Sequence, residues 1–201
     1  MKFSAHDQER MNDFYDSKVR SHGVNTPQGL SWISDHTQKT RFKVLSEIGD
    51  LNNKSILDVG CGFGDLYQYL SNRFHGFLYT GIDVTSLMIE TAKKNLPHIK
   101  FIEGDYGQFQ TNEFDYILAS GSLSFMVDNY KDVYYAMIKK MFFDSKLGVA
   151  FNMLDQKHHK QDETFATYSP SEIAGYCFGL TKNVILREDY LHGDFTIYLY
   201  H

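Results

Sequence analysis

The segment Ser55–Leu66, with the sequence SILDVGCGFGDL, constrains the fold more than any other part of the chain. An apolar run over residues 56–59 predicts a strand, and apolar residues at helical spacing from Leu66 onward predict a helix. Three glycines separate the two: Gly60, Gly62 and Gly64. Without a Cβ, the backbone of this turn can lie directly against a ligand, beside the free N–H groups of the following helix. The segment therefore predicts a strand, turn and helix that cradle a nucleotide.

An acid at the end of the predicted strand, Asp58, indicates which nucleotide the turn binds. The dinucleotide fingerprint is G-x-G-x-x-G, with the pyrophosphate at the helix N-terminus. Here the glycines follow the pattern G-x-G-x-G, and the Asp58 carboxylate would repel a pyrophosphate but suit an ammonium group. S-adenosylmethionine carries an ammonium group and no phosphate, so the pattern predicts it as the cofactor.

Later strand-like segments supply the other groups that this cofactor needs. A ribose-binding acid is expected about 20 residues past the glycines, where residues 76–83 predict a strand that ends in Asp83. Residues 98–103 predict a third strand, followed by Gly104–Tyr106, whose Asp105 can hold the adenine. A fourth predicted strand, Phe114–Ser120, ends near the expected position of the methyl group.

In order and spacing, these motifs resemble the class I S-adenosylmethionine-dependent methyltransferases. The matching segments are Leu57–Gly64, Gly81–Asp83, Glu103–Asp105 and Phe114–Tyr116. One such motif is a weak signal, whereas four in register are a strong one. The resemblance implies a Rossmann-like α/β methyltransferase fold, with a mostly parallel seven-stranded sheet, helices on both faces and a C-terminal antiparallel hairpin. The flanking segments look similar to small bacterial members, which implies a fold and a cofactor but no particular substrate.

The remaining periodicity fits this fold. Residues 4–20 predict an amphipathic helix and residues 21–32 a loop. Ser34 or Asp35 is expected to cap a second helix, with Gln38 completing a capping box after Asp35. Strands then alternate with helices over residues 55–154, which predicts a mostly parallel sheet.

Beyond this alternating region, residues 155–168 predict a surface loop, and Ser169 with Pro170 marks the start of a helix. The runs 183–190 and 195–200 predict a hairpin. We expect residues 1–48 to form a helical lid and residues 49–201 to form the methyltransferase domain.

Composition narrows the class of protein. A chain of 201 residues that is 42% hydrophobic fits one globular unit, and its net charge of −5 argues against general binding to nucleic acid. Cys61 and Cys177 have no metal-type spacing and predict reduced thiols, hence a cytoplasmic location. No signal peptide and no apolar run of about 20 residues is present, so we expect no membrane contact. His158 and His159 are adjacent and diverge, so no metal site is predicted.

The predicted cofactor site combines the glycine turn, the strand ends and one preceding helix. Its members are Arg41, Asp58, Gly60, Cys61, Gly62, Gly64, Asp83, Val84, Met88, Gly104, Asp105, Tyr106 and Ser120. Asp83 is expected to bind the ribose diol. Arg41 is expected to pair with the cofactor carboxylate or an anionic substrate, or else to be an ordinary exposed arginine. Met88 packs against the adenine or within the core.

Two residues are candidates for the acceptor side. His22 can act as a general base, since its unperturbed pKa is about 6.5, and the alternative is a surface or capping histidine. Asn152 is polar within an apolar strand and must find a partner, which is the substrate if it faces the carboxyl edge. The segment Ala119–Ser122 lacks the prolines and the aromatic residue with which adenine and cytosine DNA methyltransferases hold a flipped base.

Together these features predict an enzyme that moves a methyl group from S-adenosylmethionine to a small-molecule acceptor by in-line displacement. Two alternatives stay open at this point. One is an RNA or protein methyltransferase that needs a partner chain, and the other is a non-catalytic cofactor-binding subunit. The oligomeric state is left open as well.

Overall fold

The computed structural model describes residues 2–24, 26–30, 34–111 and 114–201. Its α-helices are α1 (Ala5–His22), α2 (Asp35–Ser46), α3 (Asp65–Ser71), α4 (Ser86–Asn95), α5 (Tyr130–Asp144) and α6 (Pro170–Phe178). Its strands are β1 (Ser55–Val59), β2 (Leu78–Asp83), β3 (Lys100–Glu103), β4 (Phe114–Ala119), β5 (Ser145–Leu154), β6 (Val184–Arg187) and β7 (Asp194–Tyr200). Two short 3-10 helices, η1 (Gln28–Leu30) and η2 (Tyr106–Gln108), complete the described elements.

The strands form one sheet in the order β3-β2-β1-β4-β5-β7-β6. Strand β7 runs antiparallel to both β5 and β6, while the other neighbouring strands are parallel. The predicted fold class is therefore confirmed, including the C-terminal hairpin. Strand β6 ends at Arg187, earlier than predicted. The chain bends at residues 189 and 190, and Arg187 Nε donates to Asp189 Oδ1 at 2.6 Å.

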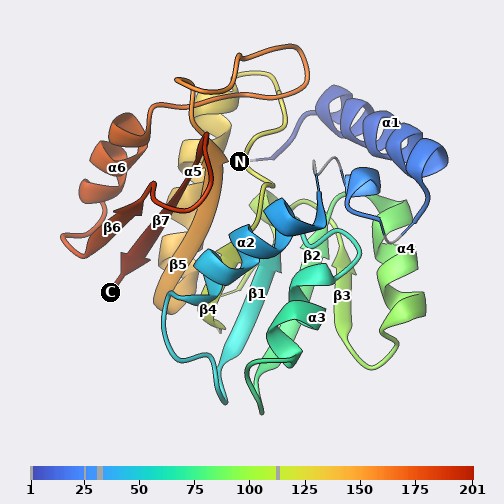
Figure 1. The fold of residues 1–201 in the computed structure, drawn as a ribbon, viewed down its shortest axis with the longest axis horizontal. Helices are drawn as coiled ribbons and strands as arrows, with labels where there is room; N and C mark the ends of the chain where they lie inside the picture. The colour runs from blue at the N-terminus through green and yellow to red at the C-terminus, as the bar shows by residue number, and fades with distance from the viewer. Residues whose placement is uncertain (1, 25, 31–33, 112–113) are drawn as a thin grey trace.

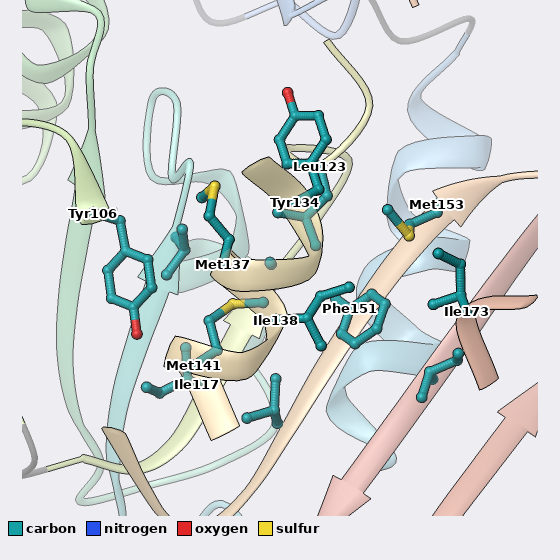
Figure 2. Close-up of a cluster of buried hydrophobic side chains, with 14 of the residues drawn as sticks. Tyr106, Ile117, Leu123, Tyr134, Met137, Ile138, Met141, Phe151, Met153 and Ile173 are labelled. Carbon is teal, nitrogen blue, oxygen red and sulfur yellow. The ribbon is translucent and has the colours of Figure 1, made fainter. Parts of the chain in front are cut away.

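Helices cover both faces of the sheet (Figure 1). Helices α5 and α6 pack in one buried cluster, in which Met137, Ile138 and Met141 lie with Phe151 of β5 (Figure 2). Helices α2, α3 and α4 belong to a second cluster on the opposite face, together with Ile56 of β1. Because successive side chains of a strand point to opposite faces, β1 supplies both clusters: Leu57 and Val59 belong to the first and Ile56 to the second.

Helix α1 is held across the edge at which the parallel strands end. The Asp7 side chain is 2% exposed; its Oδ1 accepts from the backbone N–H of Asp128 at 2.9 Å and its Oδ2 accepts from Ser4 Oγ. The backbone N–H of Phe3 donates to Asp105 Oδ2 at 2.8 Å. These buried contacts attach the start of α1 to loops beyond β3 and β4.

The start of α2 differs in detail from the prediction. Ser34 is the N-cap, and Thr37 rather than Gln38 completes the capping box. Gln38 lies one residue further on, and its Nε2 donates to Asp65 Oδ2 at 3.0 Å. The predicted loop before α2 contains η1; its Asn25, Ser31 and Trp32 lie outside the described residues.

We expect Asp7→Ala to weaken the attachment of α1. The change leaves the N–H of Asp128 without its acceptor and removes the capping box, at a cost of about 1–3 kcal/mol in the free energy of unfolding. Urea unfolding and hydrogen exchange of α1 amides measure the effect. Asp13→Ala, an exposed position on the same helix, is the control and should change neither. Equal behaviour of the two variants would contradict this account.

Candidate functional site

A cavity of about 280 Å³ lies at the carboxyl edge of the sheet. The ends of β1, β2, β4 and β5 line it, and residues of α1, α2 and η1 complete its wall. Neighbouring parallel strands end at this edge, so residues from distant parts of the chain meet there. This is the usual position for a ligand in an open α/β sheet.

The glycine turn approaches the neighbouring loop so closely that a side chain is excluded. Gly60 has a φ of +75°, and a Cβ there would lie 2.2 Å from the Cβ of Ser122. Ser122 Oγ in turn donates to the carbonyl oxygen of Val59 at 2.6 Å. Gly64 faces away, toward Phe101. The turn thus presents its backbone to the cavity through Gly60 and Gly62.

Asp58 is a buried acid, and only one of its two carboxylate oxygens accepts a hydrogen bond from the described residues. Its side chain accepts from the hydroxyl of Tyr79 through Oδ2 at 2.6 Å. Among the described residues, Asp58 Oδ1 has no hydrogen-bond partner. Burial raises the pKa of Asp58 to about 7; the hydrogen bond from Tyr79 lowers it, and the nearby Asp83 and Asp65 raise it further. A cation in the cavity would favour the charged form.

The Asp83 carboxylate is held rigidly at the end of β2. Oδ1 accepts from the backbone N–H of Thr85 at 2.9 Å, and Oδ2 accepts from that of Gly62 at 2.9 Å. Burial raises the pKa of Asp83, while these hydrogen bonds act against the rise. Burial and the charge of Asp83 both raise the pKa of Tyr15, which lines the cavity from α1. The Tyr15 hydroxyl therefore stays protonated near the Asp83 carboxylate.

Further polar atoms in the cavity wall lack partners within the described part of the chain. They are Ser120 Oγ, Ser124 Oγ and Asn152 Nδ2, all buried. The other side-chain atom of Asn152, Oδ1, accepts from the backbone N–H of Gly121 at 2.8 Å. A buried polar atom without a hydrogen bond is costly, and clustering of such atoms in one cavity indicates a ligand site.

Arg41 and Asp194 form an ion pair in the wall of the cavity. Arg41 Nη2 lies 2.7 Å from Asp194 Oδ1, and both side chains are buried. Arg41 is thus not the exposed arginine of the alternative interpretation.

The cavity brings together most of the residues predicted from sequence. Those that line it are Arg41, Asp58, Gly60, Cys61, Gly62, Asp83, Val84, Met88, Gly104, Tyr106, Ser120 and Asn152.

Gly64, Asp105 and His22 lie outside the set of lining residues. Gly64 begins α3 and packs on Phe101 instead. The Asp105 carboxylate accepts from the backbone of Phe3 and Gly107. His22 is exposed at the end of α1 and does not line the cavity.

Sequence reasoning missed several lining residues. Tyr15, Phe125 and Phe165 come from a helix face and from loops that were interpreted as packing or surface. Tyr79 was missed because its partner Asp58 lies 21 positions away. The sequence gives one indication of its position: Tyr79 and Asp83 are four residues apart, so their side chains lie on the same face of the strand.

Two kinds of feature, a membrane-spanning helix and a cluster of metal ligands, are absent from the described residues. None of their helices combines the length and the apolar character that crossing a bilayer requires. Nor does any group of three or more His, Cys, Asp or Glu side chains gather there in a way suited to binding a metal ion.

Comparison with known proteins agrees with this geometry. A family model described as a methyltransferase domain matches residues 56–142. A relative, the trans-aconitate 2-methyltransferase of Yersinia pestis, is 26% identical over 151 residues, which are 74% of this chain and 58% of that protein. The chain therefore spans less than two thirds of the length of this curated relative.

Solved structures share the fold across nearly the whole chain. The magnesium protoporphyrin IX methyltransferase of Synechocystis, crystallised with bound SAM, superposes with a TM-score of 0.69 at 16% identity and 97% coverage of both chains. A putative methyltransferase of Haloferax volcanii, solved in complex with the Trm112 methyltransferase activator, gives a TM-score of 0.67 at 13% identity, covering 93% of this chain and 95% of that one.

We expect the buried Asp58 to make stability depend on pH. Its pKa of about 7 lies above the ordinary 3.8, so the folded state binds the proton more tightly than the unfolded state. The stabilisation that the bound proton gives to the folded state is complete below the ordinary pKa of 3.8. It is lost as the pH rises through the folded-state pKa of about 7. Asn at this position cannot ionise, so the stability of Asp58→Asn relative to wild type should increase with pH across this window.

The increase should be on the order of 4 kcal/mol, at 1.36 kcal/mol per pKa unit. Urea unfolding at a series of pH values measures the difference. A difference that stays constant with pH would mean that Asp58 titrates normally.

Proposed function

We propose that the chain is a class I S-adenosylmethionine-dependent methyltransferase, which transfers a methyl group from S-adenosylmethionine to a small-molecule acceptor. The methyltransferase family model that matches residues 56–142 supports this proposal. The observation that carries this proposal is the unpaired Asp58 oxygen in a cavity that also holds the glycine turn and Asp83. A carboxylate at each end of a short backbone cradle fits a ligand with an ammonium group and a ribose diol.

The residues present fit this cofactor. Asp58 Oδ1 would accept from the ammonium group, which also resolves the unfavourable burial of that oxygen. Asp83 would accept from the ribose hydroxyls, since each of its oxygens has lone pairs beyond the backbone N–H that it already binds. Val84, Met88 and Tyr106 line the same cavity and would pack beside the adenine.

When bound, S-adenosylmethionine would supply a methyl group on a positively charged sulfur. In the displacement, the acceptor's lone pair bonds to the methyl carbon and the sulfur keeps the electron pair of the broken carbon–sulfur bond. The protein's task is to orient the acceptor and to exclude water. We propose residues 1–48 as a lid with this role, which is supported by the position of Met11 and Tyr15 in the cavity wall. Residues 49–201 would then be the catalytic domain.

The small acceptor is supported by the size of the cavity, about 280 Å³, and by the curated relative, which is named for trans-aconitate. The net charge of −5 gives no support to binding of a nucleic acid polymer. Two buried free thiols, Cys61 and Cys177, support a cytoplasmic location.

Labelled cofactor and a metabolite extract separate this function from its alternatives. A small-molecule methyltransferase should yield a labelled small product and S-adenosylhomocysteine. A partner-dependent RNA or protein methyltransferase would yield neither until its partner and target are added. A non-catalytic subunit would bind the cofactor and never convert it.

We expect Asp83→Ala to weaken binding of S-adenosylhomocysteine. Loss of buried hydrogen bonds to the ribose should cost at least about 1–3 kcal/mol of binding free energy. Isothermal calorimetry measures this directly. Asp115→Ala, at a strand end remote from the cavity lining, serves as control. An unchanged affinity in Asp83→Ala would refute the ribose assignment.

We also expect Tyr79→Phe to impair recognition of the cofactor's amino-acid end. The change frees Asp58 Oδ2 and removes a bond that lowers the pKa of Asp58, so affinity for S-adenosylhomocysteine should fall several-fold, most strongly below about pH 7. Affinity for 5′-methylthioadenosine, which lacks the amino-acid end, should stay the same.

Tyr198→Phe is the matched control for this experiment, since the Tyr198 hydroxyl is also buried and donates at 2.6 Å, to the carbonyl of Val44. Equal loss of both ligands in Tyr79→Phe would point to general damage of the fold instead.

A further inference from the structure

Tyr15, Phe125 and Phe165 form an aromatic wall of the cavity. The rings of Tyr15 and Phe125 lie 6.1 Å apart, and those of Phe125 and Phe165 lie 6.5 Å apart. Backbone hydrogen bonds from Met126 to Thr164 and from Ala166 to Ser124 join the two loops that carry this wall. These hydrogen bonds fix the positions of Phe125 and Phe165 relative to each other.

The same cavity holds buried side-chain polar atoms that have no hydrogen-bond partner among the described residues. Asn152 is 1% exposed, and its Oδ1 already accepts from the backbone of Gly121. Its Nδ2, an atom that can only donate, has no partner among the described residues. Ser124 Oγ is in the same state and is 4% exposed. A ligand oxygen that accepts hydrogen bonds would satisfy both side chains.

The charges in the wall oppose an anionic acceptor. Of the described residues that line the cavity, Arg41 alone carries a permanent positive charge, and it is paired with Asp194 at 2.7 Å. The carboxyl groups of Asp58, Asp65 and Asp83 line the same cavity. A carboxylate that enters the cavity would meet these acids, while the Arg41 guanidinium is already engaged by Asp194.

From these three features we propose that the methyl acceptor is an uncharged, mostly apolar small molecule with an oxygen that accepts a hydrogen bond from Asn152. This inference rests on the proposed function and names the substrate class of its site. It separates this chain from relatives named for trans-aconitate, a molecule with three carboxylates. For a hydroxyl acceptor, the oxygen's lone pair forms the bond to the methyl carbon, the methyl–sulfur bond breaks with its electron pair on sulfur, and the hydroxyl proton passes to solvent.

A pair of probes of equal shape and different charge tests the proposal. Calorimetry on the full chain saturated with S-adenosylhomocysteine compares para-hydroxybenzamide with para-hydroxybenzoate and with trans-aconitate. The uncharged amide should bind at least about tenfold more tightly than either anion. Tighter or equal binding of an anion, or no binding of the amide, would overturn the proposal.

Two variants assign the preference to particular atoms. Asn152→Asp keeps the acceptor for Gly121 but replaces the donor, so it should weaken binding of para-hydroxybenzamide, and Asn152→Ser provides a second variant if the first is poorly folded. Asp194→Asn removes the charge that engages Arg41 and should strengthen binding of para-hydroxybenzoate. The absence of both effects would contradict the roles given to these residues.

The binding of S-adenosylhomocysteine is measured first, which keeps the two proposals separate. A wild-type chain that does not bind S-adenosylhomocysteine contradicts the proposed function itself. A chain that binds it and then prefers the anions contradicts only the acceptor class.

Discussion

The contact between the glycine turn and the ends of its two neighbouring strands is the constraint on which the site depends. The backbone N–H of Gly60 donates to the carbonyl of Ile82 at 2.8 Å, and that of Gly62 donates to Asp83. On the other side, Ser122 Oγ donates to the carbonyl of Val59. These contacts hold β2 and the β4–α5 loop against the glycine turn, so backbone atoms line the cavity there. They also place Asp58 of β1 and Asp83 of β2 at the same edge of the sheet.

Burial of acids at this edge is a compromise between stability and binding. Burial raises the pKa of Asp58, Asp65 and Asp83, which means that their charged forms are disfavoured in the folded chain without a ligand. A cationic ligand would recover part of that cost. The same residues that make the empty cavity electrostatically unfavourable would therefore make it selective for a positively charged ligand group.

Features that depend on neighbours in sequence were predictable, and those that depend on strand register were not. The turn, the strands and Asp83 follow from local spacing and hydrophobic pattern. The Tyr79–Asp58 hydrogen bond requires the register that pairs Asp58 of β1 with Gly81 of β2. In this register Tyr79 lies two residues before Gly81, on the same face of the sheet as Asp58. The Arg41–Asp194 pair joins residues 153 positions apart. The exposed position of His22 at the end of α1 could not be predicted either, because proximity to a loop in sequence does not say where a helix end lies.

Two residues of the aromatic wall, Phe125 and Phe165, lie on loops rather than on the strands of the sheet. Phe125 and Phe165 belong to two loops that hold each other through backbone hydrogen bonds, which tolerate almost any side chain. Mutations in these loops can reshape the acceptor end while the sheet edge beneath it stays intact. The acceptor end and the sheet edge are thus formed by different residues. A new acceptor specificity could therefore evolve through a few changes in residues 123–126 and 162–166, while the residues that bind the methyl donor stay the same.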